Sequence, residues 1–227
     1  VGELIFDDAP PLAASARTRG RGGGGVGAGG QACSGSLVKD DRVLTAAHCV
    51  WNARQGSLAA GSAFVPGLYR DPGSGRAVRP FGSARWRAVT LLDGGGDDAA
   101  VVALDRRLGR QAGTLGVRAC PPPGGGGPGE RASGPARQTL YAVGYPVDRP
   151  PGTCAVSACD VILACSAGGG EGQATKHACD TGPGQSGAPM IDASNYVRGV
   201  HVGAVQGLGI NEFVTLTAPM AARIASW

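Results

Sequence analysis

Three polar residues stand beside apolar runs, in positions from which they could together activate a hydroxyl group as a nucleophile. His48 follows a short apolar run, Asp98 directly precedes another, and Ser186 lies in a glycine-rich turn. A neutral imidazole can take the proton from a serine hydroxyl as it attacks, and a buried carboxylate can hold the imidazolium that forms. These residue types therefore indicate hydrolysis of an amide by an activated serine.

The glycines around Ser186 have a chemical reason of their own. A tetrahedral intermediate needs backbone N–H groups aimed at its oxyanion, and we expect those of Gly184 and Ser186 to form this oxyanion hole. The turn that aims them is one that few side chains tolerate. Losing one such donor typically costs about 3 kcal/mol of transition-state stabilisation.

Two further residues, Asp97 and His177, are of the same chemical types as members of this set. Asp97 adjoins Asp98 and is the minor alternative for the carboxylate; Asp98 is preferred because it directly precedes the apolar run. His177 has no motif around it, and we interpret it as a surface or loop residue.

The segments that must position this chemistry are short β-type runs separated by Gly, Pro and Asp. Short strands at this spacing predict an all-β sandwich or barrel. Near the C-terminus, Thr217 can cap a helix that has Pro219 in its first turn and apolar residues at 220, 224 and 227 on one face. The apolar runs span 33–38, 42–47, 86–92, 99–104, 138–144, 161–165, 188–192, 197–205 and 212–216.

A proline- and glycine-rich segment at 120–129 can be neither strand nor helix and lies near the middle of the chain. We interpret it as the connection between two β domains, residues 1–118 and residues 119–227. Within the first domain, residues 1–32 form a glycine-rich segment with few periodic apolar residues. The G-x-G-x-x-G match within residues 25–30 has no readable strand before it or helix after it, so we interpret it as chance.

Composition narrows the function classes further. The formal net charge of +4 is too small and too scattered to indicate a nucleic-acid partner. No apolar run approaches the ~20 residues of a membrane-spanning helix. Seven cysteines without C-x-x-C spacing indicate disulfides formed in an oxidising compartment, so we expect a secreted or extracytoplasmic protein. We also expect no metal and no cofactor.

From about Cys33 to the C-terminus, the chain resembles the serine endopeptidases of the chymotrypsin-like superfamily. The segments T-A-A-H-C at 45–49, D-D-A-A-V-V-A-L at 97–104 and G-Q-S-G-A-P at 184–189 occur in that family's order of His, Asp and Ser. The resemblance implies two six-stranded antiparallel β-barrels, with the active site in the cleft between them.

The resemblance also assigns roles to individual residues. It implies a catalytic triad of His48, Asp98 and Ser186, and a disulfide between Cys33 and Cys49 that ties the histidine loop to its neighbouring strand. The other five cysteines can form at most two further bridges, and the sequence leaves their pairing open.

One position departs from the commonest form of the serine motif, which has Asp before the serine; here it is Gln185. An uncharged side chain cannot bind the N-terminal ammonium that organises the oxyanion hole of the animal digestive enzymes, so that activation mechanism should be absent. The segments D-T-G-P-G-Q-S-G-A-P at 180–189 and G-V-H-V-G at 199–203 instead resemble the glutamyl endopeptidase (V8-like) branch. That branch often begins its mature chain at a Val whose amine helps to bind substrate.

The expected specificity pocket allows two interpretations. Asp180 lies six residues before Ser186, where trypsin-like enzymes keep the carboxylate that binds Arg or Lys. Thr181 and His201 would instead donate hydrogen bonds to a carboxylate, and the α-amine of Val1 would add positive charge if it reaches the cleft. We favour cleavage after Glu, less so Asp, with cleavage after Arg or Lys as the alternative. A Glu substrate requires Asp180 to point away or to be neutralised.

A rival of another class is a protease-like binding module that keeps the fold without turnover. Such proteins usually lose a member of the triad, and here all three residue types are present. We therefore expect an active, monomeric endopeptidase that acts on polypeptides and has no nucleic-acid or membrane partner.

Overall fold

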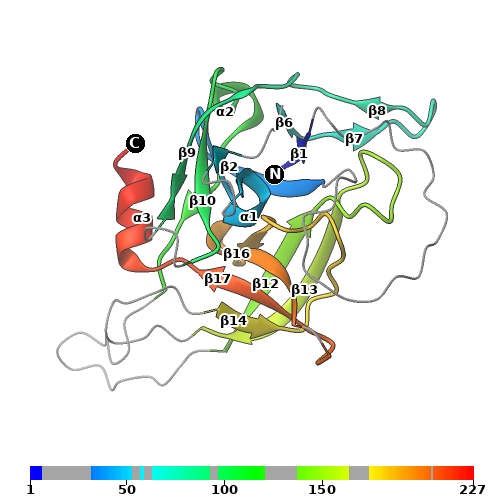
Figure 1. Cartoon of the computed structure of the whole chain (residues 1–227). Helices are drawn as coiled ribbons and strands as arrows, with labels where there is room; N and C mark the ends of the chain where they lie inside the picture. Colours follow the sequence, from blue (N-terminus) through cyan, green and yellow to red (C-terminus); the bar gives the residue numbers. More distant parts are fainter. Residues whose placement is uncertain are drawn as a thin grey trace.

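The computed structural model describes two curled antiparallel sheets followed by a C-terminal helix (Figure 1). This arrangement confirms the predicted all-β, chymotrypsin-like architecture of two six-stranded units. The described residues are 1–6, 32–52, 57–58, 63–92, 97–120, 137–163, 174–205 and 207–227.

The first sheet brings the expected histidine and aspartate to one end of two adjacent strands. In spatial order it contains β6 (Ala63–Pro66), β1 (Gly2–Ile5), β2 (Cys33–Lys39), β3 (Arg42–Thr45), β10 (Ala100–Leu104) and β9 (Trp86–Leu91). Ala100 of β10 is opposite Thr45 of β3. His48 lies on the short helix α1 (Ala47–Val50) that follows β3, and Asp98 lies just before β10. Antiparallel pairing therefore places these two residues close together.

The second sheet carries the expected serine and pocket residues. In spatial order it contains β13 (Ala155–Ile162), β12 (Arg137–Gly144), β15 (Pro189–Ile191), β16 (Tyr196–Val205), β17 (Ile210–Thr215) and β14 (Ala174–His177). Ser186 lies three residues before the start of β15, and His201 lies in the middle of β16, the neighbour of β15. The loop with the serine is thus supported by the strand that carries His201.

A few short elements lie outside these two paths. They are β4 (Trp51–Asn52), β5 (Ser57–Leu58), β7 (Tyr69–Arg70), β8 (Ala77–Val78), α2 (Gly109–Ala112) and β11 (Gly116–Val117). The strand β11 pairs in parallel with β16 of the second sheet although it precedes residue 119 in the chain. The predicted boundary at 118/119 stays a prediction.

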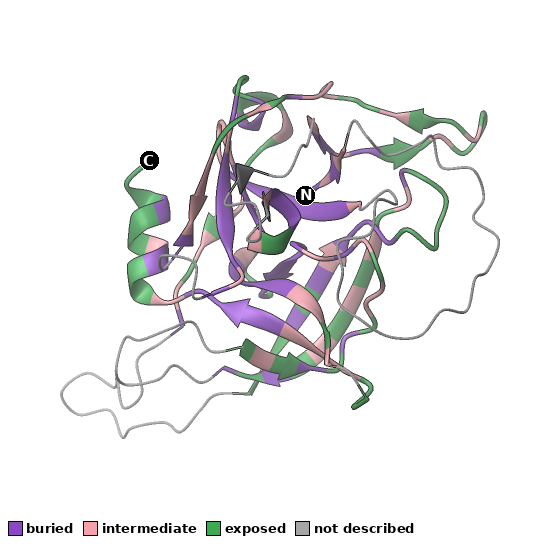
Figure 2. Cartoon of the chain, viewed as in Figure 1, coloured by how far each residue is buried: buried purple, intermediate pink, exposed green. Residues whose placement is uncertain are grey.

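Apolar side chains from both sheets form one buried cluster. Leu44 and Val102 of the first sheet and Val200 and Val214 of the second belong to it, and each is at most 3% exposed. Figure 2 shows this as buried strands facing the middle of the molecule, while the outer strands β9, β13 and β14 have mostly intermediate and exposed positions. Burial of these strand faces, the main driving force of folding, therefore joins the two halves.

The C-terminal helix α3 (Ala218–Ala225) forms where the sequence predicts it. The Thr217 side chain accepts a hydrogen bond from the Met220 N–H and so caps the first turn. Met220 and Ile224 are buried against the core as expected. Trp227 is not: it is 38% exposed, because the helix ends before it and its side chain falls beyond the buried face.

Four strands of the two sheets differ from the sequence-based expectations, and two of them, β6 and β14, lie where no apolar run was found. The glycine-rich N-terminal segment contains a strand, β1, which inserts between β2 and β6 and buries Leu4 completely. The strand expected at 161–165 begins earlier, at Ala155, because its inward side chains are small and give little apolar signal. The connector at 120–129 (apart from Cys120) and the G-x-G-x-x-G match lie outside the described residues.

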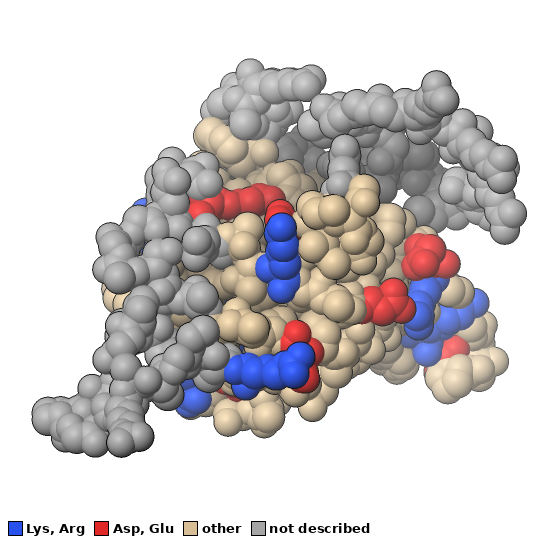
Figure 3. All heavy atoms as spheres, turned by 90° about the horizontal axis from the view of Figure 1, so that it is seen from below, with Lys and Arg blue, Asp and Glu red and all other residues tan. Residues whose placement is uncertain are grey.

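The charged surface is mixed. On the face seen in Figure 3, acidic and basic side chains lie close to one another. No described helix is long and apolar enough to cross a membrane. The expectations of no nucleic-acid and no membrane partner stay predictions.

Each of the two described disulfides ties a strand to a neighbouring residue outside the strands. Cys33 and Cys49 are bridged, as the resemblance implies, and so are Cys159 and Cys179. Cys120 is also disulfide-bonded, whereas Cys154 is a free, exposed thiol.

Removing the Cys33–Cys49 bridge should lower the free energy of unfolding by about 3 kcal/mol, because a loop of this length then regains its entropy in the unfolded chain. Urea denaturation of Cys33→Ala/Cys49→Ala, compared with the unmodified protein, measures this loss. Cys154→Ala is the control, since it removes a sulfur without opening a bridge. Equal stability of the double variant and the control would contradict the prediction.

Candidate active site

His48 and Asp98 form a direct hydrogen-bonded pair. His48 Nδ1 lies 2.5 Å from Asp98 Oδ2, and the His48 backbone N–H donates to Asp98 Oδ1 over 2.8 Å. The two side chains are 40% and 35% exposed, so a substrate can reach them. Burial raises the pKa of Asp98, but the hydrogen bonds and the charge of His48, with the Ala47 backbone, outweigh it and lower the pKa overall. The carboxylate is therefore ionised and able to hold an imidazolium.

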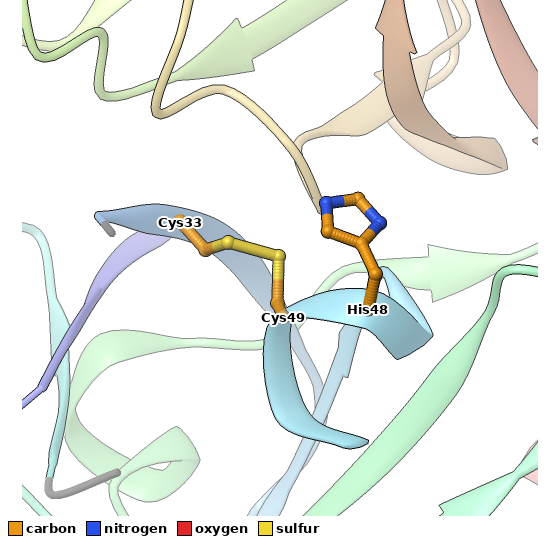
Figure 4. Close-up of side chains that lie close together, drawn as sticks. All are labelled: Cys33, His48 and Cys49. Carbon is orange, nitrogen blue, oxygen red and sulfur yellow. A yellow bond between two sulfur atoms is a disulfide. The ribbon is translucent and has the colours of Figure 1, made fainter. Parts of the chain in front are cut away.

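The backbone around His48 is fixed on both sides. The helix α1 is only four residues long and begins without a side-chain cap. The disulfide from Cys49 to Cys33 of β2 anchors it, as Figure 4 shows with His48 projecting from the adjacent turn of ribbon. A short helix of this kind would be marginal alone, so the covalent bond holds the imidazole in place.

The turn that carries Ser186 requires glycine at two positions. Gly184 has φ +93°, and a Cβ there would lie 2.6 Å from the Tyr145 carbonyl oxygen. Gly187 has φ +84°, and a Cβ there would lie 2.1 Å from the Ser34 carbonyl oxygen. No side chain fits either position, which explains the G-Q-S-G pattern by backbone geometry.

The Ser186 hydroxyl does not bond the imidazole in this structure. Its Oγ donates to the Val202 carbonyl over 3.4 Å, a long hydrogen bond. The Ser186 carbonyl lies 3.7 Å from Cys49 Sγ, next to His48 in the chain. Bonds between nucleophile and base are often loose without substrate. The structure thus joins His48 to Asp98 and places Ser186 beside this part of the chain.

Ser34 was not expected to matter, yet it anchors the loop of the expected oxyanion hole. Its backbone N–H donates to the Ser186 carbonyl over 2.7 Å, and its hydroxyl donates to the Gly184 carbonyl over 3.0 Å. The peptide groups 184–185 and 186–187, which contain these two carbonyls, are therefore held from the first sheet. The sequence signal is slight: a small polar residue after Cys33 in a run of buried positions.

Gln185 is buried and closes the turn without using charge. Its Oε1 accepts from the Gly182 N–H over 2.8 Å, and its own N–H donates to the Gly182 carbonyl over 3.1 Å. Its Nε2 is buried without a hydrogen-bond partner among the described residues. The side chain that departs from the commonest motif is thus a structural clamp of the loop.

His201 is paired with His177, a residue that the sequence interpretation placed on the surface. That interpretation is wrong: His177 is 3% exposed, and its Nε2 lies 3.1 Å from Nδ1 of His201. Local sequence could not reveal this, because the two residues meet only through β17, which pairs with both of their strands.

The residues expected to form the specificity pocket lie in separate places. Asp180 and Thr181 line a cavity of about 220 Å³, and Thr181 Oγ1 is buried there without a partner among the described residues. His201 is not among the described residues that line it. Val1 packs beside Val65 and Tyr145, and burial lowers the pKa of its α-amine. The roles of these four candidates in substrate binding stay predictions.

Two groups of metal-ligand type occur in the described residues. One contains Cys33, His48 and Cys49, and the other contains Cys159, His177 and Cys179. In each group the two sulfurs are bonded to each other, so neither is a thiolate that could bind a metal.

The two curled sheets, with a histidine on the first and a serine turn on the second, define the chymotrypsin-like fold. Residues 33–200 match the family model of the trypsin-like peptidase domain. The chain therefore belongs to the trypsin-like peptidase family. No curated protein matches the sequence significantly.

Solved structures share this fold. A Glu endopeptidase matches with a TM-score of 0.68 and 22% identity over 87% of this chain and 85% of that chain. The protease Anisep from Arthrobacter nicotinovorans matches with a TM-score of 0.63 and 16% identity over 100% and 95%. Human heparin binding protein matches with a TM-score of 0.59 and 14% identity over 88% and 86%. At these identities the likeness shows the fold alone.

The buried histidine pair should make stability depend on pH. Burial is the main cause that lowers the pKa of His177 and His201 to about 4, below the 6.5 of an ordinary histidine. The unfolded chain therefore binds more protons between these values, and the stability present above pH 6.5 is lost progressively as the pH falls toward 4. Despite burial, the pKa of Asp98 is lowered from that of an ordinary carboxyl by its bonds to His48, so this group does not titrate in the window.

Urea denaturation at several pH values between 4.5 and 7 checks this prediction, with about one pH unit between points. The double variant His177→Gln/His201→Gln is the control, because it removes both titrating groups and should show a shallower decline. The same decline in the control would contradict it. The imidazole proton resonances should show both rings neutral at pH 6 in the folded protein.

Proposed function

We propose that the protein is a secreted serine endopeptidase that hydrolyses peptide bonds of polypeptides through an acyl-enzyme. The observation that carries the proposal is the 2.5 Å contact between His48 Nδ1 and Asp98 Oδ2, close to the glycine turn of Ser186. Membership of the trypsin-like peptidase family supports the same reaction class. The two described disulfides support an oxidising compartment.

The proposed reaction uses each member of the triad once in each half. His48 Nε2 takes the proton of the Ser186 hydroxyl as Oγ attacks the carbonyl carbon of the substrate. Asp98 holds Nδ1–H and stabilises the imidazolium. The imidazolium then protonates the leaving amine, which departs as the C–N bond breaks and leaves an acyl-enzyme. A water molecule, deprotonated by His48, hydrolyses that ester and restores the serine.

The oxyanion formed at each attack would be held by the N–H groups of Gly184 and Ser186. The carbonyls of these two residues accept hydrogen bonds from Ser34, which constrains the orientation of the turn. Donors that are fixed before the reaction need no reorganisation as the charge develops.

We further propose cleavage after Glu, and less so after Asp. The support is His201, a buried, neutral imidazole that can donate a hydrogen bond to a carboxylate. It adjoins the serine loop, because the Gly187 N–H donates to the His201 carbonyl over 2.7 Å. Thr181 adds a hydroxyl with no other partner among the described residues. Val1 remains a proposed source of positive charge.

Cleavage after Arg or Lys is the second candidate, favoured by Asp180. This carboxylate is exposed, lines the cavity beside Thr181 and forms no ion pair with a described residue. Arg149 lines the same cavity. A guanidinium substrate in this cavity would gain from Asp180, and His201 does not line the cavity and so would neither bind nor oppose it.

A binding module without turnover is the candidate of another class. The fold is shared with human heparin binding protein, so fold alone does not decide between binding and catalysis. The intact set of His48, Asp98 and Ser186 favours turnover.

Ser186→Ala should abolish proteolysis, and a fluorophosphonate should label the native protein at Ser186. Asp98→Asn should lower kcat by about 10⁴, the loss known for the same substitution in a chymotrypsin-like triad, because the imidazole is held in the wrong tautomer. Asp97→Asn is the matched control and should keep most of the turnover. Failure of native protein to label at Ser186 would refute the proposed enzyme.

Matched peptides that differ only in Glu or Arg before the scissile bond test the specificity by kcat/KM. We expect a preference for Glu that collapses in His201→Ala while fluorophosphonate labelling continues. Asp180→Ser should change it little or improve it, because a like charge is removed. A preference for Arg that disappears in Asp180→Ser would establish the second candidate instead.

A further inference from the structure

A second buried histidine lies against His201 and takes no part in the proposed hydrolysis. His177 ends β14, and its ring packs edge-on against those of His201 and Phe213, at centroid distances of 5.2 and 5.8 Å. Buried polar groups are costly unless hydrogen-bonded. Here each imidazole supplies a partner for the other.

One backbone hydrogen bond decides which nitrogen of each ring carries a proton. The Cys179 N–H donates to Nδ1 of His177 over 3.2 Å, so this nitrogen is unprotonated and neutral His177 carries its proton on Nε2. That Nε2–H donates to Nδ1 of His201 over 3.1 Å. Neutral His201 then carries its own proton on Nε2. The chain of bonds gives His201 the tautomer that offers an Nε2–H donor.

The first donor of this chain is held covalently. Cys179 is bonded to Cys159, and its carbonyl accepts a hydrogen bond from Asn211 Nδ2 over 2.9 Å. Both neighbouring sulfurs are used in the disulfide, so His177 Nδ1 has the N–H of Cys179, not a metal, as its partner. The cluster therefore orients a hydrogen bond.

The charge state of the pair agrees with this assignment. Burial is the main cause that lowers the pKa of both rings to about 4. His177 and, less, His48 lower the pKa of His201 further, whereas the backbone carbonyl of Glu212 raises the pKa of both rings. Each ring is neutral with a single proton above about pH 5, which is where the tautomer matters.

We propose that His177 is a positioning residue that sets the specificity pocket to accept a carboxylate, by fixing His201 in the Nε2–H tautomer. The proposal rests on the proposed cleavage after Glu. Without His177, Nδ1 of His201 loses its donor, and nothing then disfavours the Nδ1–H tautomer. Nε2 would then be an acceptor, which repels a carboxylate instead of binding it.

Two substitutions separate the hydrogen bond from the packing. His177→Phe keeps a ring against Phe213 but has no donor, whereas His177→Gln keeps an N–H donor near the position of Nε2. The substrates are matched peptides with Glu or Gln before the scissile bond, which have the same shape and differ in charge. The ratio of kcat/KM for Glu over Gln should fall about tenfold or more in His177→Phe, through KM. His177→Gln should retain most of the ratio, and both variants should label normally at Ser186.

The pH profile gives a readout that packing alone would not move. Burial, the main cause that lowers the pKa of His201, stays in place in His177→Phe, so the ring should remain neutral and lowering the pH should not restore its Nε2–H donor. The Glu preference lost in His177→Phe should therefore not return between pH 5.5 and 7, whereas the donor of His177→Gln should restore it at every pH in that range. The unmodified protein should keep its Glu preference throughout the same window, which lies about one unit or more above the pKa of its rings.

The outcomes separate the two proposals. If the unmodified protein prefers Glu and His177→Phe keeps the ratio of kcat/KM for Glu over Gln, the positioning role is wrong and the Glu specificity stands. If the unmodified protein has no preference for Glu, the specificity fails. In that case, or if His177→Phe does not fold, long-range ¹⁵N–¹H spectra of the unmodified protein report the tautomer of His201 directly. A proton on Nδ1 of His201 would overturn the positioning role, and a proton on Nε2 supports it.

Discussion

The two halves of the active site depend on the contacts of one fully buried serine on β2. Ser34 donates its N–H to the carbonyl of Ser186 and its hydroxyl to the carbonyl of Gly184, and the same hydroxyl accepts the N–H of Tyr145. Its carbonyl accepts the hydroxyl of Thr45 over 2.8 Å. Every polar atom of this residue is used, and the partners lie on both sheets. A shift of one sheet against the other would therefore leave several buried groups unpaired, at about 1–3 kcal/mol each.

The covalent structure reinforces that junction. Ser34 follows Cys33, whose disulfide partner Cys49 adjoins His48. Two adjacent residues of β2 thus hold both groups. Cys33 holds the segment of the base through the disulfide, and Ser34 holds the loop of the nucleophile through hydrogen bonds. A relative displacement of ~1 Å between a base and a nucleophile is enough to lower the rate by a large factor. The contacts of Cys33 and Ser34 therefore fix the distance on which the rate depends.

Local sequence was sufficient where chemistry depends on neighbours in the chain. The glycines around Ser186, the strand before His48 and the Thr217 cap are set by steric and hydrogen-bonding preferences that act within a few residues. The contacts of Ser34 and the His177–His201 pair join residues that only tertiary pairing brings together. Their types are compatible with many other roles, so no local pattern distinguishes them.

Gln185 organises this loop without charge. Where related enzymes use a carboxylate and an N-terminal ammonium, an amide here bonds the N–H of Gly182 while its backbone bonds the carbonyl of the same residue. A buried ion pair gains little net stability after desolvation, whereas an amide holds the turn at lower desolvation cost. The neutral imidazoles of His177 and His201 follow the same rule. In this half of the site, selectivity for an anionic side chain would then come from the direction of hydrogen-bond donors. The attraction of these donors for the substrate carboxylate would have to exceed its repulsion by Asp180.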